Sequence, residues 1–170
     1  KTTTSSILAH VLYQSSEQCN AFIGGISSNY NSNCLIAPDA KRIVVEADEF
    51  DRSFLHLKPN YAIITTTDAD HLDIYGDAHT LQKSFADFVA RINPTGQLFV
   101  HADVDLSVLN IPKELNYKQY GFNTQGWTTR DSLTYRNGKM YFDISSPTTV
   151  YKDVEFGLPG QHNAENALAV

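Results

Sequence analysis

The chain has 170 residues and a formal net charge of −6, with 42% hydrophobic and 19% charged residues. This length suits one domain of ordinary size, and the acidic balance argues against the basic surface with which proteins bind nucleic acid. No apolar run approaches the roughly 20 residues that span a membrane, so we expect no membrane insertion and no nucleic-acid partner. Cys19 and Cys34 lack a metal-binding spacing, and the expected location is cytoplasmic.

The first expected element is a helix near the N-terminus. Apolar residues at positions 7, 8, 11 and 12 define one buried face, and the threonines and serines before them suit a helix entrance. Lys1-Thr2 at such an entrance looks like the end of a phosphate loop of pattern G-x-x-x-x-G-K-[ST]. The glycines of such a loop would precede Lys1.

Three short strands are expected next. Ala21–Ile23 ends at Gly24-Gly25, which we interpret as a turn in preference to a close approach of the backbone to a ligand. Ile43–Val45 and Tyr61–Thr65 have the β-branched composition of buried strands in a parallel sheet. Each of these two strands stops at a cluster of acidic residues, and we expect the two to be neighbours.

The acidic clusters are the candidate functional residues. Ligands of open α/β sheets bind at the carboxyl ends of the strands, where Glu46 and His71 would lie. Carboxylates crowded at one edge repel each other unless a cation lies among them, so a divalent metal ion is expected. The alternative is that these acids are solvated loop residues. Further candidates in the same clusters are Asp48, Glu49, Asp68, Asp70 and Asp73.

The second half of the chain changes character near Tyr117. Before it, the pattern predicts a helix over 81–92, a strand over Gln97–Val100 and a short helix over Val104–Leu109. After it, segments with period-two alternation flank Asn137-Gly138, the strongest short hairpin signal. We therefore expect a small antiparallel sheet added to the parallel one, followed by a loop and a last helix.

Five motifs occur together in a recognisable order. They are Lys1-Thr-Thr-Thr, Glu46-Ala-Asp-Glu-Phe-Asp with Ser53-Phe-Leu-His-Leu-Lys-Pro59, Asp70-His-Leu-Asp73, Tyr120-Gly-Phe122 and Gly160-Gln-His-Asn-Ala-Glu-Asn-Ala167. With these motifs the chain resembles the central, ATP-binding domain of the Mur ligases over nearly its whole length. The resemblance implies an α/β fold: a P-loop-type, mostly parallel sheet flanked by helices, with a small antiparallel sheet in the C-terminal part. It also implies that residues 1–170 are this domain alone, without the UDP-binding and amino-acid-binding domains.

The resemblance assigns roles to the site residues. Lys1 matches the lysine that contacts the β- and γ-phosphates of ATP, with Thr2 and Thr3 beside it in the nucleotide site. Thr2 and Glu46 match the ligands of a first Mg²⁺, and His71 matches a ligand of a second. Mn²⁺ can substitute for Mg²⁺ in such sites. Asn163 and Asn166, three apart on one helix face, match the pair that reads adenine, although Asn163 alone would equally suit a helix N-cap.

The implied reaction is that of the alanine-adding member of the family. ATP phosphorylates the lactyl carboxylate of UDP-N-acetylmuramate, and the amine of L-alanine attacks the acyl phosphate. Lys1, Glu46 and His71 would form the catalytic group. Two features depart from the family pattern: Thr66 stands where many relatives have asparagine, and no lysine occupies the position that sister ligases carbamylate.

Three other functions stay open. The murein tripeptide-recycling ligase of the same family shares the E-A-D-E element. A metal-dependent phosphohydrolase could use Asp68, Asp70, His71 and Asp73, and a nucleotide-binding module could lack catalysis altogether. Amide formation that depends on ATP and the UDP-sugar acid would separate the ligase from the last two.

Overall fold

The computed structural model describes all residues except 51, 69–74, 76 and 130–132. The chain divides into two compact units, residues 1–47 with Val170 and residues 48–169. We describe each unit by itself. The helices in the described part of the chain are too short or too polar to cross a lipid bilayer.

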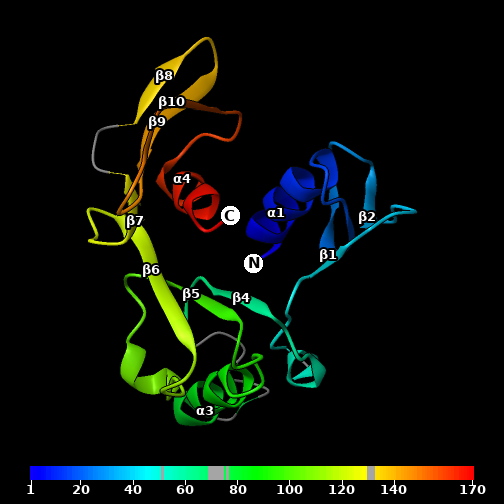
Figure 1. Ribbon diagram of the computed structural model, residues 1–170, viewed down its shortest axis with the longest axis vertical. Coiled ribbons are helices and arrows are strands. Elements are labelled where there is room, and N and C mark those ends of the chain that lie inside the picture. Colours follow the sequence, from blue (N-terminus) through cyan, green and yellow to red (C-terminus); the bar gives the residue numbers. More distant parts are fainter. Residues whose placement is uncertain (51, 69–74, 76, 130–132) are drawn as a thin grey trace. The chain divides into compact units, whose positions relative to one another are not determined.

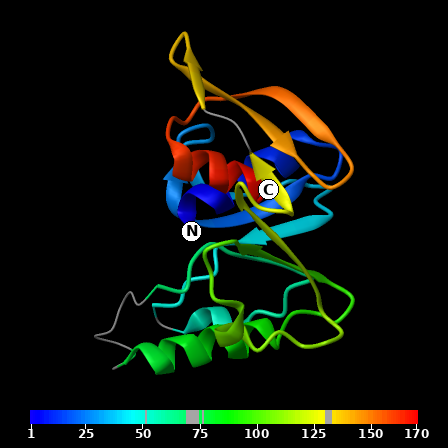
Figure 2. The same cartoon turned by 90° about the vertical axis from the view of Figure 1, so that its left-hand side faces the viewer.

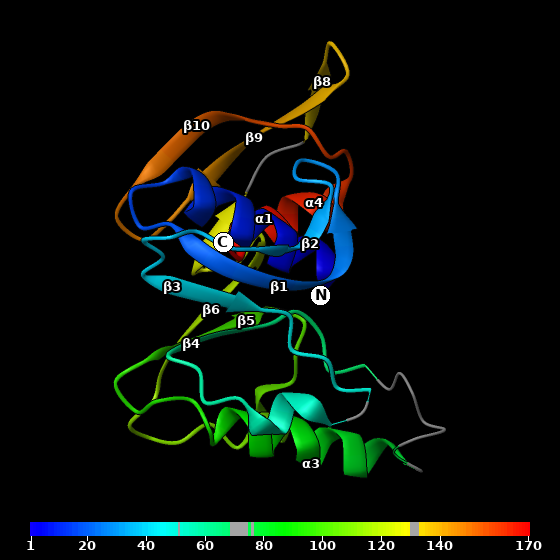
Figure 3. The same ribbon diagram turned by 90° about the vertical axis from the view of Figure 1, so that its right-hand side faces the viewer.

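The first unit is a three-stranded sheet covered on one face by a helix (Figure 3). Strand β1 lies between an antiparallel neighbour, β2, and a parallel neighbour, β3. Alternate residues of β1 point toward the helix, where Ala21 and Ile23 pack with Ala9 and Val44 in one core cluster. The elements are α1 (Thr2–Gln14), β1 (Cys19–Ser27), β2 (Ser32–Leu35) and β3 (Arg42–Val45).

The expected turn at Gly24-Gly25 is wrong, because both glycines lie within β1. The strand continues to Ser27, and only then does the chain reverse into β2. The glycine pair here serves a close approach, since a Cβ atom on Gly24 would lie 3.0 Å from the carboxylate oxygens of Glu46.

The described residues of the second unit form one sheet of seven strands. Strands β4 to β7 are mutually parallel in the order β7-β6-β5-β4, and β9 and β10 extend the β7 edge in antiparallel fashion. Strand β8 pairs with β9. The strands are β4 (Tyr61–Ile64), β5 (Gln97–His101), β6 (Asn116–Phe122), β7 (Trp127–Thr129), β8 (Thr134–Arg136), β9 (Lys139–Ser145) and β10 (Val150–Phe156). The helices are η1 (Ser53–His56), α3 (Ala78–Val89), η2 (Leu106–Leu109) and α4 (Gln161–Leu168).

Alternation along the central strands separates the two faces of this sheet. Ile63 and Phe99 pack with Tyr120 and Leu168 on the face that α4 covers (Figure 1). Their neighbours along β4 and β5, including Leu98, are buried on the opposite face. Helix α3 and η1 pack against each other through aromatic side chains (Figure 2).

The hairpin prediction at Asn137-Gly138 is confirmed. Both residues have positive φ, 52° and 76°, as a two-residue type I′ turn requires, and they join β8 to β9. The prediction of a separate antiparallel sheet from Tyr117 onward is wrong in part, since β6 and β7 continue the parallel sheet. Period-two alternation reports a strand with two different faces, and it does not distinguish parallel from antiparallel pairing.

The two strands that end in acidic clusters belong to different units. Strand β3 pairs with β1 in the first unit, and β4 pairs with β5 in the second. The expectation that these two strands are neighbours therefore stays a prediction.

Candidate functional site

The clearest polar constellation of the first unit joins the start of α1 to the end of β3. The Oγ1 hydroxyl of Thr2, the first residue of the helix, donates to Oε1 of Glu46 at 2.7 Å. Glu46 directly follows the last residue of β3. A strand end and a helix N-terminus therefore bring together two oxygen-bearing side chains that are far apart in the sequence.

The second oxygen of the Glu46 carboxylate is held by the backbone of β1. The amide N–H of Gly24 donates to Glu46 Oε2 at 2.7 Å, and the backbone N–H of Glu46 donates to the Phe22 carbonyl at 2.9 Å. These contacts extend the β1–β3 ladder by one residue and direct the side chain toward α1. A Cβ atom at position 24 would crowd this carboxylate, whose oxygens would have to shift by a few tenths of an ångström.

This arrangement fits a hard divalent cation. Hydroxyl and carboxylate oxygens are the donors that Mg²⁺ prefers, and adjacent ligands of an octahedral ion with bonds of about 2.1 Å lie about 3.0 Å apart. The observed separation of 2.7 Å between the two oxygens is close to that spacing. The N-terminus of α1, with its outward-facing N–H groups, also suits an anion such as a phosphate.

The other residues predicted near the phosphates lie at the same helix end. Lys1 is exposed and occupies the N-cap position of α1, and Thr3 is half-buried within the first turn. The first turn of α1 contains no acidic side chain that would compete with a phosphate. Lys1, Thr2 and Thr3 are thus gathered at one helix N-terminus, as predicted.

The remaining acidic candidates separate into three groups. Asp48 caps a local turn by accepting from the Phe50 N–H at 3.3 Å, and Glu49 is buried with its carbonyl oxygen accepting from Tyr75. Asp68 is exposed, and its own N–H donates to Thr66 Oγ1 at 3.1 Å. Asp70, His71 and Asp73 lie outside the described residues. In the described ranges, no three His, Cys, Asp or Glu side chains form a group suited to a metal ion.

Helix α4 presents the two predicted asparagines. Its N-cap is Gly160, with φ of 102°, so Asn163 is not the N-cap residue. The amide nitrogen of Asn163 donates to the Pro159 carbonyl at 2.7 Å, which ties the side chain to the loop before the helix. Asn166 follows one turn later. Asparagine can form two hydrogen bonds with the edge of adenine, and residues three apart share a helix face.

A polar group beneath α4 was not predicted from the sequence. His101, the last residue of β5, lies 3.5 Å from Glu165 of α4, measured from Nε2 to Oε1. Buried Tyr120 stands edge-on to the His101 ring, and burial together with the Glu165 charge raises the pKa of its hydroxyl. His101 and Glu165 are distant in sequence and belong to no spacing motif, so only the register of the sheet and the seating of α4 reveal the pair.

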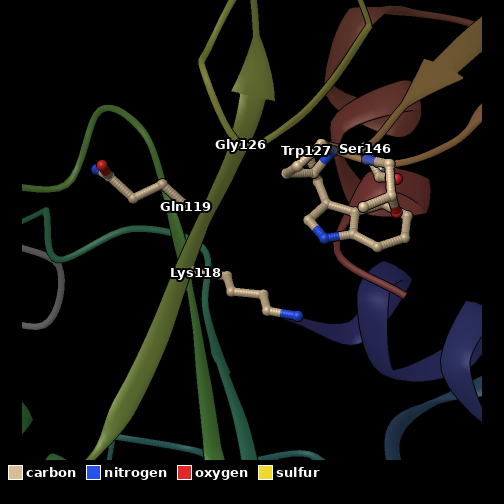
Figure 4. A pocket seen from close by; sticks show the side chains of 7 residues that line it. Lys118, Gln119, Gly126, Trp127 and Ser146 are labelled. Atoms are coloured by element: carbon tan, nitrogen blue, oxygen red, sulfur yellow. Dashed lines mark hydrogen bonds between the residues drawn. The ribbon is translucent and has the colours of Figure 1, made fainter.

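One hollow of about 300 Å³ lies on the second unit, on the sheet face near the start of β7. Figure 4 shows Trp127 and Ser146 at one side of it and Lys118 at another, while Gln119 projects from the opposite side of β6. None of the predicted site residues lines it.

The chain is similar to known proteins over its whole length. The family model of the Mur ligase middle domain matches residues 1–170. UDP-N-acetylmuramate–L-alanine ligases from Flavobacterium psychrophilum and Flavobacterium johnsoniae are 48% and 45% identical over 168 and 170 residues. In each case the match covers 99% of this chain and 35% of the relative, so the chain spans about a third of the length of these proteins.

Solved structures show the same fold. The UDP-N-acetylmuramate:L-alanyl-γ-D-glutamyl-meso-diaminopimelate ligase of Neisseria meningitides has a TM-score of 0.82 at 25% identity, covering 99% of this chain and 56% of that one. The UDP-N-acetylmuramate–alanine ligase of Thermotoga maritima has a TM-score of 0.79 at 25% identity, covering 99% and 37%. A match of the family model to the entire chain establishes membership: the chain belongs to the Mur ligase family, as a Mur ligase middle domain.

Proposed function

We propose that the chain is the ATP-binding central domain of a UDP-N-acetylmuramate–L-alanine ligase, an enzyme of peptidoglycan precursor synthesis. The observation that carries the proposal is the 2.7 Å contact between Thr2 and Glu46 at the N-terminus of a helix. The relatives of 45–48% identity bear the name of this ligase, which supports the choice of substrates. The UDP-binding and amino-acid-binding domains would lie outside residues 1–170.

Thr2 and Glu46 would hold Mg²⁺, which neutralises phosphate charge when bound. Lys1 would add a positive charge near the β- and γ-phosphates, and the N–H groups of the first turn of α1 would donate hydrogen bonds to the phosphate oxygens. His71 would serve a second ion, and Mn²⁺ could replace Mg²⁺ at both sites. These groups lower the repulsion between ATP and the incoming carboxylate, which must approach each other for phosphoryl transfer.

Asn163 and Asn166 would bind the adenine base. Each amide offers an acceptor for the 6-amino group and a donor for N7. The bond from Asn163 to the Pro159 carbonyl supports this role, because it orients the amide before the base arrives. In the proposed reaction the γ-phosphate of ATP passes to the lactyl carboxylate of UDP-N-acetylmuramate and ADP is released. The amine of L-alanine then attacks the acyl phosphate, which gives the amide and phosphate. Because the reaction consumes ATP, we place it in the cytoplasm.

The murein tripeptide-recycling ligase is the second candidate. The Neisseria ligase, named for a tripeptide substrate, has the higher TM-score of the two solved structures above. The fold of this domain is common to both activities, so the choice between them depends on the amino acid or peptide that is joined.

The test is amide formation by the complete protein with ATP, Mg²⁺ and UDP-N-acetylmuramate. We expect product with L-alanine and little with the tripeptide L-alanyl-γ-D-glutamyl-meso-diaminopimelate. Preference for the tripeptide would replace the proposal by the recycling ligase. Release of phosphate from ATP without any amide product would favour a phosphohydrolase and overturn both.

A further inference from the structure

Helix α4 is anchored to the sheet by a buried polar contact in addition to its apolar residues. The side chains of His101 and Glu165 are each only 13% exposed, and their atoms Nε2 and Oε1 lie 3.5 Å apart. His101 Nε2 is fully buried and has no hydrogen bond among the described residues. The pair therefore lies in the interface between the end of β5 and the inner face of α4.

The hydrogen bond at Nδ1 determines which ring nitrogen of the neutral His101 side chain carries the proton. The backbone N–H of Asp103 donates to His101 Nδ1 at 3.3 Å, so Nδ1 is the acceptor and Nε2 carries the proton. That proton is directed toward the Glu165 carboxylate. The other charged groups near this pair are at the surface: Asp103 and His162 have side chains that are 92% and 98% exposed.

Glu165 also lies on the opposite side of α4 from Asn163. At about 100° per residue, two positions along an α-helix rotate a side chain by about 200°. The apolar contribution to the seating of this helix is small in volume, since Ala164, Leu168 and Ala169 are its buried apolar residues. Glu165 Oε1 also accepts a hydrogen bond from the exposed amide of Gln161 at 3.4 Å, on the same helix, so His101 is the partner of this carboxylate on the sheet side. A carboxylate with so little exposure tolerates little rotation of the helix, because rotation would separate it from His101.

We propose that His101 is a positioning residue for base recognition. By holding Glu165 on the inner face, it sets the rotation of α4 about its axis and thereby directs Asn163 and Asn166 toward adenine. This inference rests on the proposed function, in which these asparagines read the base. It predicts that substitutions of His101 or Glu165 weaken the binding of a base that carries a 6-amino group and leave the binding of the phosphates unchanged.

The experiment measures binding of ATP and of inosine triphosphate to the complete protein by calorimetry. The two nucleotides share their phosphates and ribose, but inosine carries a carbonyl in place of the 6-amino group. The variants are His101→Leu, Glu165→Leu, the double variant of both, and His79→Leu as a matched control at an exposed site on α3. Glu165→Gln, which keeps the shape of the side chain, serves if a leucine variant fails to fold.

We expect each single variant to raise the Kd of ATP about tenfold, the loss of one base contact, while the Kd of inosine triphosphate stays within about twofold. The double variant should raise the Kd of ATP no further than either single variant, because the two side chains act through one shared contact. Unchanged ATP affinity in the single variants would overturn the inference. Equal loss for both nucleotides would overturn it as well, since the pair would then support the fold and not the reading of the base.

The proposed function can fail independently of this inference. Wild-type protein that forms no amide in the ligase assay contradicts the function. Wild-type protein that forms the amide, with His101→Leu retaining full discrimination between the two nucleotides, contradicts the positioning role alone.

Discussion

The residues proposed to bind the phosphates and those proposed to bind adenine belong to different units and are held in different ways. At the phosphate end, Thr2 lies at the start of a helix and Glu46 at the end of a strand. The Glu46 carboxylate accepts two hydrogen bonds, one from the Thr2 hydroxyl and one from the backbone N–H of Gly24. At the adenine end, Asn163 stands on a short helix whose inner face carries the Glu165 carboxylate, 13% exposed, against His101. At the phosphate end the hydrogen bonds hold the side chains that are proposed to contact the ligand. At the adenine end the contact of His101 with Glu165 holds the helix that carries the proposed ligand-binding side chains.

This difference determines how substitutions should act. At the phosphate end, a change in Glu46 alters the atoms that we expect to touch the cation, so activity should fall with little loss of stability. At the adenine end, a change beneath α4 alters orientation, so binding should weaken in proportion to the displacement of the asparagines. The predictions that follow test this contrast.

The largest effect is expected from Glu46→Ala. Removal of the carboxylate should lower ligase turnover by about two to three orders of magnitude, the range for loss of a metal ligand or charge-stabilising group. The measurement is the rate of amide formation at saturating Mg²⁺, with a thermal melt to verify folding. Glu17→Gln is the control, since its exposed ion pair with Arg42 belongs to the same unit and should contribute little. Near-normal turnover of Glu46→Ala would remove the basis for a metal role.

Gly126→Ala should produce the next largest effect, through the second unit alone. A Cβ atom at this position would lie 2.2 Å from the Gln119 carbonyl oxygen, so β7 would have to move away from β6. Because α4 packs on both strands, we expect the free energy of unfolding to fall by about 1–3 kcal/mol, the typical cost of overpacking. Chemical denaturation measures this. Gly157→Ala, which meets nothing within 4 Å, is the control, and equal stability of the two variants would contradict the packing at β7.

Gly24→Ala should act on the phosphate end with a smaller effect. The added methyl group would lie 3.0 Å from both carboxylate oxygens of Glu46, which would have to shift by a few tenths of an ångström. We expect turnover to fall by about tenfold, because a displaced ligand weakens the cation site without removing it. The assay is turnover as a function of Mg²⁺ concentration, and the loss should diminish as Mg²⁺ rises. A loss that is independent of Mg²⁺ would mean that Gly24 acts elsewhere.

The smallest effect concerns the start of α3. Asp77 accepts a hydrogen bond from the Thr80 N–H at 2.7 Å, and this bond lowers the pKa of the Asp77 carboxyl. A lowered pKa in the folded state means that the stabilisation is complete above the ordinary value of 3.8 and disappears as the pH falls through the folded-state value. Asp77→Ala should lose the stabilisation at neutral pH, whereas Asp77→Asn should keep the cap and lose its dependence on acid. Thermal melts between neutral and acidic pH measure both, and parallel curves for Asp77→Asn and the wild type would contradict this origin.

The features that could be predicted from the sequence are those whose cause lies within a few residues. Glu46 follows an apolar strand directly, the Asn137-Gly138 pair requires positive φ, and the threonines at the N-terminus enter a helix. These signals predicted the hairpin, the end of β3 and the first helix, whereas the pairing of Thr2 with Glu46 was implied only by the resemblance to the Mur ligases. Backbone conformation is set locally in all three, which is why a short pattern suffices.

The features that could not be predicted depend on pairing between distant segments. Gly24-Gly25 resembles a turn until β3 is placed beside β1, where the glycines allow the approach of the Glu46 carboxylate. The alternating pattern of β6 fits either strand direction. The contact of His101 with Glu165 requires both the end of β5 and the seating of α4, and neither residue stands in a spacing that indicates the other.

The most direct test of the central claim is the position of the cation. Crystals of the complete protein grown with Mn²⁺ and a non-hydrolysable ATP analogue would reveal the metal by its anomalous scattering. We predict a peak within about 2.2 Å of both Thr2 Oγ1 and one carboxylate oxygen of Glu46, with the phosphates at the N-terminus of α1. A peak that lies away from these two oxygens, with Thr2 still donating its hydrogen bond to Glu46, would contradict the account.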